Sequence, residues 1–112
     1  MKKLFLILML LPLGINAQEK PKKNVKTEFI VVGNCDACQK RIENAALSVK
    51  GVKMAKWDIP SNVISIIYDQ RKAHIDSIHK SISSIGHDTE KSISPLAVYN
   101  ALPLCCRYIR KE

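Results

Sequence analysis

The chain has 112 residues, of which 46% are hydrophobic and 25% charged, and its 18 Lys and Arg against 10 Asp and Glu give a formal net charge of +8. This length allows one domain and little else. The lysines are scattered and form no basic stripe interleaved with aromatic residues. We therefore expect no nucleic-acid partner and interpret the charge as favouring solubility and attraction to anionic partners.

The first 17 residues have the build of a secretory signal peptide. A short basic head precedes the apolar run Leu4–Leu13, and the small residue Ala17 stands where a signal peptidase cuts. The run is far shorter than the ~20 apolar residues that span a bilayer. We expect cleavage after Ala17, a periplasmic or secreted mature protein that is not membrane-anchored, and a basic lead-in over residues 18–26.

The first strand and helix follow this lead-in. The β-branched and aromatic run Thr27–Val32 predicts a strand that stops at a Gly-Asn turn. A helix capped by Asp36 is expected next and ends before Gly51. Its apolar face is marked by residues at helical spacing, namely Cys38, Ile42, Ala45 and Val49.

A hairpin and a second helix come next. Val52–Ile59 and residues 64–68 are predicted strands joined by a Pro-Ser-Asn turn, with Trp57 and Tyr68 facing the core. The second helix is indicated by Ile75, Ile78, Ile82 and Ile85, and it ends at Gly86. Two histidines, His74 at its start and His79 on its flank, are expected on the surface.

The last part of the chain predicts a short fourth strand at His87–Ile93 and a short helix within Pro95–Leu102. The element order is then β-α-β-β-α-β. Two helices on one face of an antiparallel sheet make an α+β, ferredoxin-like sandwich. We place this domain at residues 27–94 and a short C-terminal extension, which carries Cys105 and Cys106, at 95–112.

The motif formed by Cys35 and Cys38 carries the clearest chemistry. This Cys-x-x-Cys pair straddles the end of the first strand and the first turn of the helix. Free backbone N–H groups and the positive end of the helix dipole gather there and favour thiolate over thiol. Two soft sulfurs on a short loop suit a soft ion at low coordination number, such as Cu(I), whereas a closed zinc site needs four ligands.

Several motifs together carry a family resemblance: Gly33-Asn34-Cys35-Asp36-Ala37-Cys38, Gly51-Val52, Trp57-Asp58, the strand run Ile64–Asp69, and Ile85-Gly86. With them, the segment from Thr27 to Thr89 resembles the heavy-metal-associated domain family. The resemblance implies a soft-metal site at Cys35 and Cys38 that passes its ion to a partner by ligand exchange. Cu(I) is the expected cargo, with Hg(II) and Zn(II) as alternatives. The loop before the first cysteine is one residue shorter than is common in the family, and it lacks a methionine often found there.

Three further residues are candidate metal ligands. His87 directly follows the end of the second helix, at the same end of this fold as the cysteine loop, and is a third ligand, a proton-linked group that tunes the thiolates, or an ordinary loop histidine. Cys105 and Cys106 lie outside the family motif. They complete a three- or four-thiolate site with the loop cysteines, form a second metal site or a disulfide, or simply pack.

We expect an exported carrier, chaperone or scavenger of copper or mercury, whose partner is a metal-transporting membrane protein or another metal acceptor. The alternatives are a thiol–disulfide redox protein and a disulfide-stapled adaptor. A thioredoxin fold requires more elements than this chain provides, and no Trp precedes Cys35. No nucleophile elbow, phosphate-binding glycine loop or paired-carboxylate motif is present, so we do not expect an enzyme.

Overall fold

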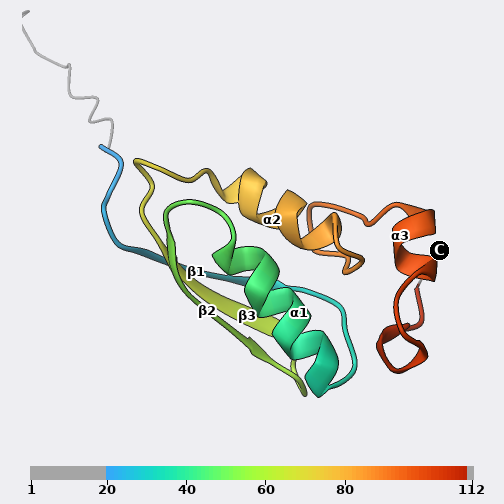
Figure 1. Cartoon of the computed structure of the whole chain (residues 1–112). Helices are drawn as coiled ribbons and strands as arrows, with labels where there is room; N and C mark the ends of the chain where they lie inside the picture. The colour runs from blue at the N-terminus through green and yellow to red at the C-terminus, as the bar shows by residue number, and fades with distance from the viewer. Residues whose placement is uncertain (1–19, 111–112) are drawn as a thin grey trace, which may run out of the picture.

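The computed structural model describes residues 20–110, so the expected signal peptide at 1–17 lies outside the described part of the chain. Figure 1 shows a small sheet with two longer helices and a C-terminal segment at one end. In chain order the elements are β1 (Val25–Ile30), α1 (Asp36–Leu47), β2 (Val52–Asp58), β3 (Val63–Tyr68), α2 (Ile75–Ser83), α3 (Leu96–Asn100) and the 3₁₀ turn η2 (Leu104–Cys106). Over residues 20–110, no helix has the length and apolar character needed to cross a membrane.

The sheet has the order β1-β3-β2, and both pairs of strands are antiparallel. One face of the central strand β3 is buried, since Ile64, Ile66 and Tyr68 alternate with half-buried residues. The inward residues of α1 and α2, among them Ile42 and Ile78, join them in one hydrophobic core. This arrangement confirms the predicted α+β, ferredoxin-like fold.

The predicted fourth strand at His87–Ile93 is reduced to a single bridge between Val31 and Thr89. The chain turns immediately after this bridge because the Thr89 hydroxyl accepts hydrogen bonds from the N–H groups of Lys91 and Ser92. Such a side-chain-stabilised turn competes with strand pairing, and it ends the ladder after one residue.

Two expectations about the helices are wrong. Asp36 is the first residue of α1 rather than its cap, and Cys35 occupies the capping position. His79 is buried rather than exposed: its ring stacks on Phe29, with ring centroids 3.8 Å apart, and its Nδ1 lies 2.6 Å from the hydroxyl of Thr89. The turn after Val31–Thr89 covers this flank of α2. His74, in contrast, is exposed as expected, and its Nδ1 accepts a hydrogen bond from the Asp76 N–H at the start of α2.

The C-terminal extension contains the predicted short helix, observed as α3 with Pro95 at its N-cap. After α3 the chain turns back so that η2 contacts α1. Leu102 packs over the end of α2, and a Cβ at Gly86 would stand 2.7 Å from its side chain. Gly86 also has a φ of +118°, a conformation that only glycine adopts readily. The extension is therefore docked on the domain and brings its cysteines to the start of α1.

Candidate metal site

The cysteine loop rests on a buried tryptophan. A Cβ at Gly33 would stand 2.9 Å from the Trp57 ring and 3.3 Å from the Cβ of Cys38, so a larger residue at position 33 would displace the loop. The indole N–H of Trp57 donates a hydrogen bond to the Val31 carbonyl at 3.0 Å. Trp57 therefore packs under the cysteine loop of this chain. The loop lacks the methionine that is common in the family which the sequence resembles.

Cys35 and Cys38 lie together at the N-terminus of α1. Cys35 caps the helix in an extended conformation and is half-buried, whereas Cys38 is buried one turn later. Their Sγ atoms are 3.5 Å apart. The capping position and the i, i+3 spacing place both sulfurs at the end of the helix where unpaired N–H groups favour negative charge.

The extension adds two more thiols to this pair. Cys106 is buried with its Sγ 3.6 Å from that of Cys35, and Cys105 is exposed with its Sγ 3.8 Å from that of Cys106. The Sγ atoms of Cys35, Cys105 and Cys106 all lie within 4.8 Å of one another, and Cys38 is outside this set of three. All four cysteines are free thiols. Below, the four are called the thiol cluster.

The backbone of the extension also contacts the cysteine loop. The Cys105 carbonyl accepts hydrogen bonds from the Asn34 side-chain amide and from the Cys35 thiol, both at 3.3 Å. Asn34 is the single residue between Gly33 and Cys35 in the shortened loop described above. The loop and the extension are thus joined through polar contacts as well as through sulfur.

Two members of the thiol cluster, Cys35 and Cys106, differ in acidity. Burial raises the pKa of Cys35, but backbone N–H groups of α1 and the neighbouring thiols outweigh it and lower the pKa to about 7. Burial, followed by the competing sulfurs of Cys38 and Cys35, raises the pKa of Cys106. Of these two residues, Cys35 therefore carries the negative charge more readily near neutral pH, and the Cys106 thiol is a donor toward it.

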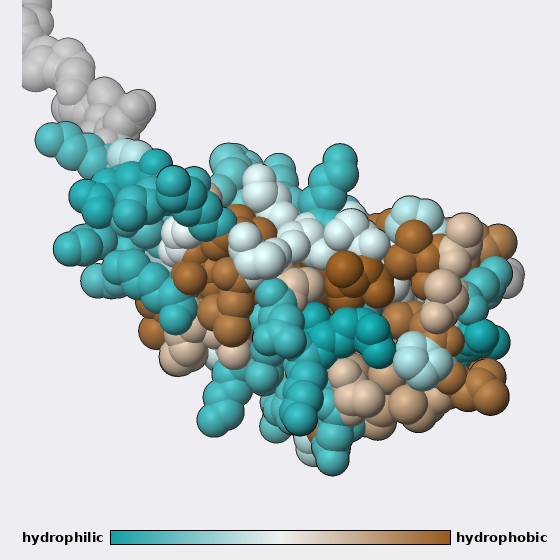
Figure 2. Space-filling view, viewed as in Figure 1, coloured by the Kyte–Doolittle hydropathy of each residue, from teal (hydrophilic) through white to brown (hydrophobic). Residues whose placement is uncertain are grey.

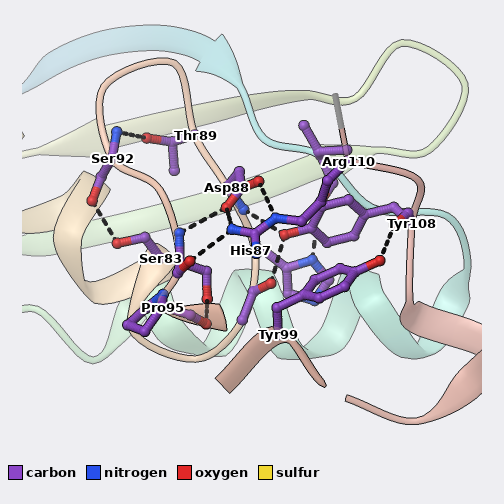
Figure 3. A network of polar contacts seen from close by, with 12 residues as sticks. Ser83, His87, Asp88, Thr89, Ser92, Pro95, Tyr99, Tyr108 and Arg110 are labelled. Atoms are coloured by element: carbon purple, nitrogen blue, oxygen red, sulfur yellow. Dashed lines mark hydrogen bonds and ion pairs between the residues drawn. The ribbon is translucent and has the colours of Figure 1, made fainter. Parts of the chain in front are cut away.

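A network of polar contacts fastens the extension to the domain (Figure 3). The Tyr108 hydroxyl donates to the Gly86 carbonyl at 2.7 Å and accepts from the Asp88 N–H at 3.0 Å. The guanidinium of Arg110 forms two hydrogen bonds with the Asp88 carboxylate, at 2.8 and 3.0 Å, and lies over the ring of Tyr99. These buried and partly buried contacts hold Tyr108 and Arg110, the second and fourth residues after η2, and so hold its cysteines in place.

His87 is buried next to this network instead of lying in an exposed loop. Its Nδ1 is 2.9 Å from the Val32 carbonyl, its ring stacks on Tyr108, and its Nε2 is buried without a hydrogen-bond partner among residues 20–110. Burial lowers the pKa of His87 and favours the neutral ring. It does not belong to the set of thiols whose sulfurs lie within 4.8 Å, so its role as a ligand stays a prediction.

The structure brings three of the five predicted ligands into one mutual group and places Cys38 in contact with one of them. Sequence reasoning missed the fastening residues Asp88, Tyr108 and Arg110. Tyr108 and Arg110 follow the Cys-Cys pair at alternate positions, but no periodic pattern links them to Asp88, which lies 20 and 22 residues before them. The potential ligands grouped within residues 20–110 offer sulfur alone. This donor set suits soft ions rather than Mg²⁺ or Ca²⁺.

Comparison with known proteins agrees with this geometry. The family model described as the heavy-metal-associated domain matches residues 28–88. Among solved structures, the chain is similar to the CopZ metallochaperone, with 24% identity, a TM-score of 0.56 and coverage of 58% of this chain and 98% of that one. No curated protein matches significantly.

Two other solved structures cover similar shares. Oxidized MerP from Ralstonia metallidurans CH34 has 19% identity and a TM-score of 0.57, covering 60% of this chain and 94% of that one. A copper-binding domain from HMA7, a P-type ATPase, has 27% identity and a TM-score of 0.56, covering 58% of this chain and 89% of that one.

Proposed function

The chain belongs to the heavy-metal-associated domain family, and from this we propose that it is an exported carrier of a soft metal ion. Cys35 and Cys38 are the proposed primary ligands. The observation that carries the proposal is their position, with two sulfurs 3.5 Å apart at the N-terminus of α1. A pKa of about 7 at Cys35 supports it, because a thiolate is available near neutral pH to capture the ion.

Capture begins at Cys35 and is completed by Cys38 in this scheme. Cys35 is half-buried and accessible, while Cys38 is buried beside it and supplies the second sulfur. Such a site holds soft ions, with Cu(I) as the proposed cargo and Hg(II) or Zn(II) as alternatives. The chemistry is capture and transfer, without a bond made or broken in a substrate, and we propose no enzymatic activity.

Transfer requires a partner whose own soft ligands reach Cys35. The extension exposes the apolar side chains of Leu96, Leu104 and Ile109, and Figure 2 shows hydrophobic side chains gathered at the end of the molecule that carries it. Exposed apolar patches of this kind favour protein contact. The net positive charge favours approach to an acidic acceptor. A metal-transporting membrane protein is the proposed acceptor.

Export is part of the proposal and has its own test. The leader-like residues 1–17 support a periplasmic or secreted protein. Expression of the full chain followed by cell fractionation and N-terminal sequencing should give a mature protein that begins at Gln18. Full-length protein retained in the cytoplasm would contradict export and leave the metal site untouched.

Metal binding is tested by titration of the reduced protein with Cu(I) against a chromophoric competitor, with native mass spectrometry to count bound ions. We expect tight binding of one ion, lost in Cys35→Ser with Cys38→Ser. His74→Asn is the control, because it removes an exposed imidazole and keeps a capping acceptor at the start of α2. Unchanged binding in the double variant would refute the carrier. A protein that binds no ion after full reduction would support the redox or stapled alternatives instead.

A further inference from the structure

The C-terminal extension places two cysteines against the proposed carrier site, beyond the part of the chain that the family model matches. We propose that Cys105 and Cys106 join Cys35 and Cys38 as ligands of the same soft metal ion, so that the cargo is enclosed by four thiolates. This inference rests on the proposed function, because it extends the same site, and it gives the extension a role in metal binding.

Three sulfur–sulfur distances within the thiol cluster are close to those between the ligands of a four-coordinate metal ion. Metal–sulfur bonds of 2.3 Å in a tetrahedral site put neighbouring sulfurs about 3.8 Å apart, whereas a linear two-coordinate site with the same bonds needs about 4.6 Å. The observed separations along the cluster are 3.5, 3.6 and 3.8 Å. A linear site at Cys35 and Cys38 alone would have to push its two sulfurs apart, while a compact site uses them nearly as they stand.

Packing alone does not explain both cysteines of the extension. Cys106 is buried, and a buried cysteine is often a simple apolar side chain. Cys105 is exposed, yet its sulfur lies within 4.8 Å of the sulfurs of both Cys35 and Cys106. A disulfide between two adjacent cysteines is strained. An exposed thiol held beside two others is explained by a shared ligand.

The extension is fastened in a way that fits a ligand-bearing cover. Arg110 and Asp88 pair with side chains only 19% and 17% exposed. The guanidinium of Arg107 donates to the Leu102 and Asn100 carbonyls, which closes the loop that carries η2. Preorganised ligands bind a metal with little ordering cost. Since Cys38 lies outside the set of three, enclosing one ion requires side-chain rotation that brings the sulfurs of Cys38 and the extension closer together, and the Cys105 side chain is exposed and free of core packing.

Loading is a ligand exchange without oxidation or reduction. Each thiol that is still protonated releases its proton to water as its sulfur binds, and the ion keeps its oxidation state. Cys105 is the exposed member of the cluster, so a partner's thiolate would displace this sulfur first. The four-sulfur set suits ions that accept three or four thiolates, such as Zn(II) and Cd(II), as well as Cu(I) and Hg(II).

The number of sulfur ligands is measured directly with Cd²⁺ as the probe. Each Cd–thiolate bond adds to the ultraviolet charge-transfer absorbance, so the absorbance per bound ion counts the sulfurs. We expect Cys105→Ser with Cys106→Ser to lower this absorbance by about half and Cys105→Ser alone by about a quarter, as two or one of four thiolates are removed. His74→Asn serves again as the control. Fluorescence of Trp57, the one tryptophan and a buried one, verifies folding of each variant.

The outcomes separate this inference from the carrier itself. An unchanged absorbance per ion in Cys105→Ser, whose exposed side chain can be replaced without disturbing the core, would overturn the four-thiolate site. If Cys35→Ser with Cys38→Ser abolishes binding and the extension variants leave the absorbance unchanged, the two-thiolate carrier stands alone. Cd²⁺ binding that survives loss of both loop cysteines would overturn the carrier and this inference together.

Discussion

Tyr108→Phe tests how firmly the extension is held over the cysteine loop. The substitution keeps the ring beside His87 but removes the hydroxyl that donates to the Gly86 carbonyl and accepts from the Asp88 N–H. A buried group left without its partner costs about 1–3 kcal/mol, and the net loss of a typical hydrogen bond costs about 0.5–1.5 kcal/mol. The free energy that keeps the extension closed should therefore fall by about 2–4 kcal/mol.

The closed extension buries the Cys106 thiol, so opening is measured by alkylation of this residue. A loss of 2–4 kcal/mol raises the open population by about 30- to 700-fold at 1.4 kcal/mol per factor of ten. When opening is fast relative to alkylation, the rate at Cys106 rises by the same factor. The assay is pulsed alkylation of the reduced, metal-free protein, followed by mass spectrometry of the peptide that contains Cys106.

Tyr68→Phe is the matched control, since it removes a hydroxyl from the core strand β3 and leaves the extension intact. The reasoning is refuted if Cys106 in Tyr108→Phe is alkylated at the rate of the wild-type protein. It is also refuted if Tyr68→Phe accelerates the reaction equally, because the effect would then come from the stability of the whole domain rather than from the extension.

Three further predictions concern the loop and the sheet. Alkylation of Cys35 should rise with pH to half of its maximum near pH 7, and Cys106→Ala should move this midpoint upward, because it removes a thiol that stabilises the thiolate; mass spectrometry across a pH series measures both. Gly33→Ala should lower the free energy of unfolding by about 1–3 kcal/mol through overpacking against the indole below it, measured by urea denaturation followed by fluorescence. The hydrogen bonds from the Arg71 side chain hold the pKa of Asp69 well below its usual range, so this carboxylate stabilises the fold above about pH 4 and the stabilisation is lost as the pH falls. Asp69→Asn should therefore lower the free energy of unfolding at pH 7, measured by urea denaturation, and the difference from the wild-type protein should become smaller in acid. An equal difference at both pH values would contradict this account.

The predictable part of the fold rests on periodic patterns. Alternation along β3 and the isoleucines of α2 each describe one face of an element, and those faces meet in the observed core. The family resemblance then identified the cysteine loop. The predicted ends of elements are less accurate. β1 spans Val25–Ile30 instead of Thr27–Val32, and Cys35 rather than Asp36 caps α1, because the ends depend on local backbone hydrogen bonds that the spacing of apolar residues does not record.

The remaining structure depends on contacts that have no period. His79 is buried because a turn formed by Thr89 folds over it, and nothing within α2 indicates this cover. The extension is positioned by Asp88 and Arg110, which are 22 residues apart and meet through one ion pair. A single long-range pair leaves no repeating signal in the sequence. For the same reason the sequence left several roles open for Cys105 and Cys106.

The two halves of the thiol cluster also differ in what holds them. Cys38 lies in α1, whose inner face is in the core, and Cys35 caps this helix, so the backbone that carries both is fixed by the packed domain. Cys106 is carried by an irregular segment that is held by side-chain hydrogen bonds around Asp88 and Gly86 and by the buried side chains of Leu102 and Tyr108. Segments held in this way open at a smaller free-energy cost than a packed helix does. If the four-thiolate site forms, opening the extension exchanges a closed site for an accessible pair at the start of α1, and the free energy of those hydrogen bonds and buried contacts then limits how readily the ion is released.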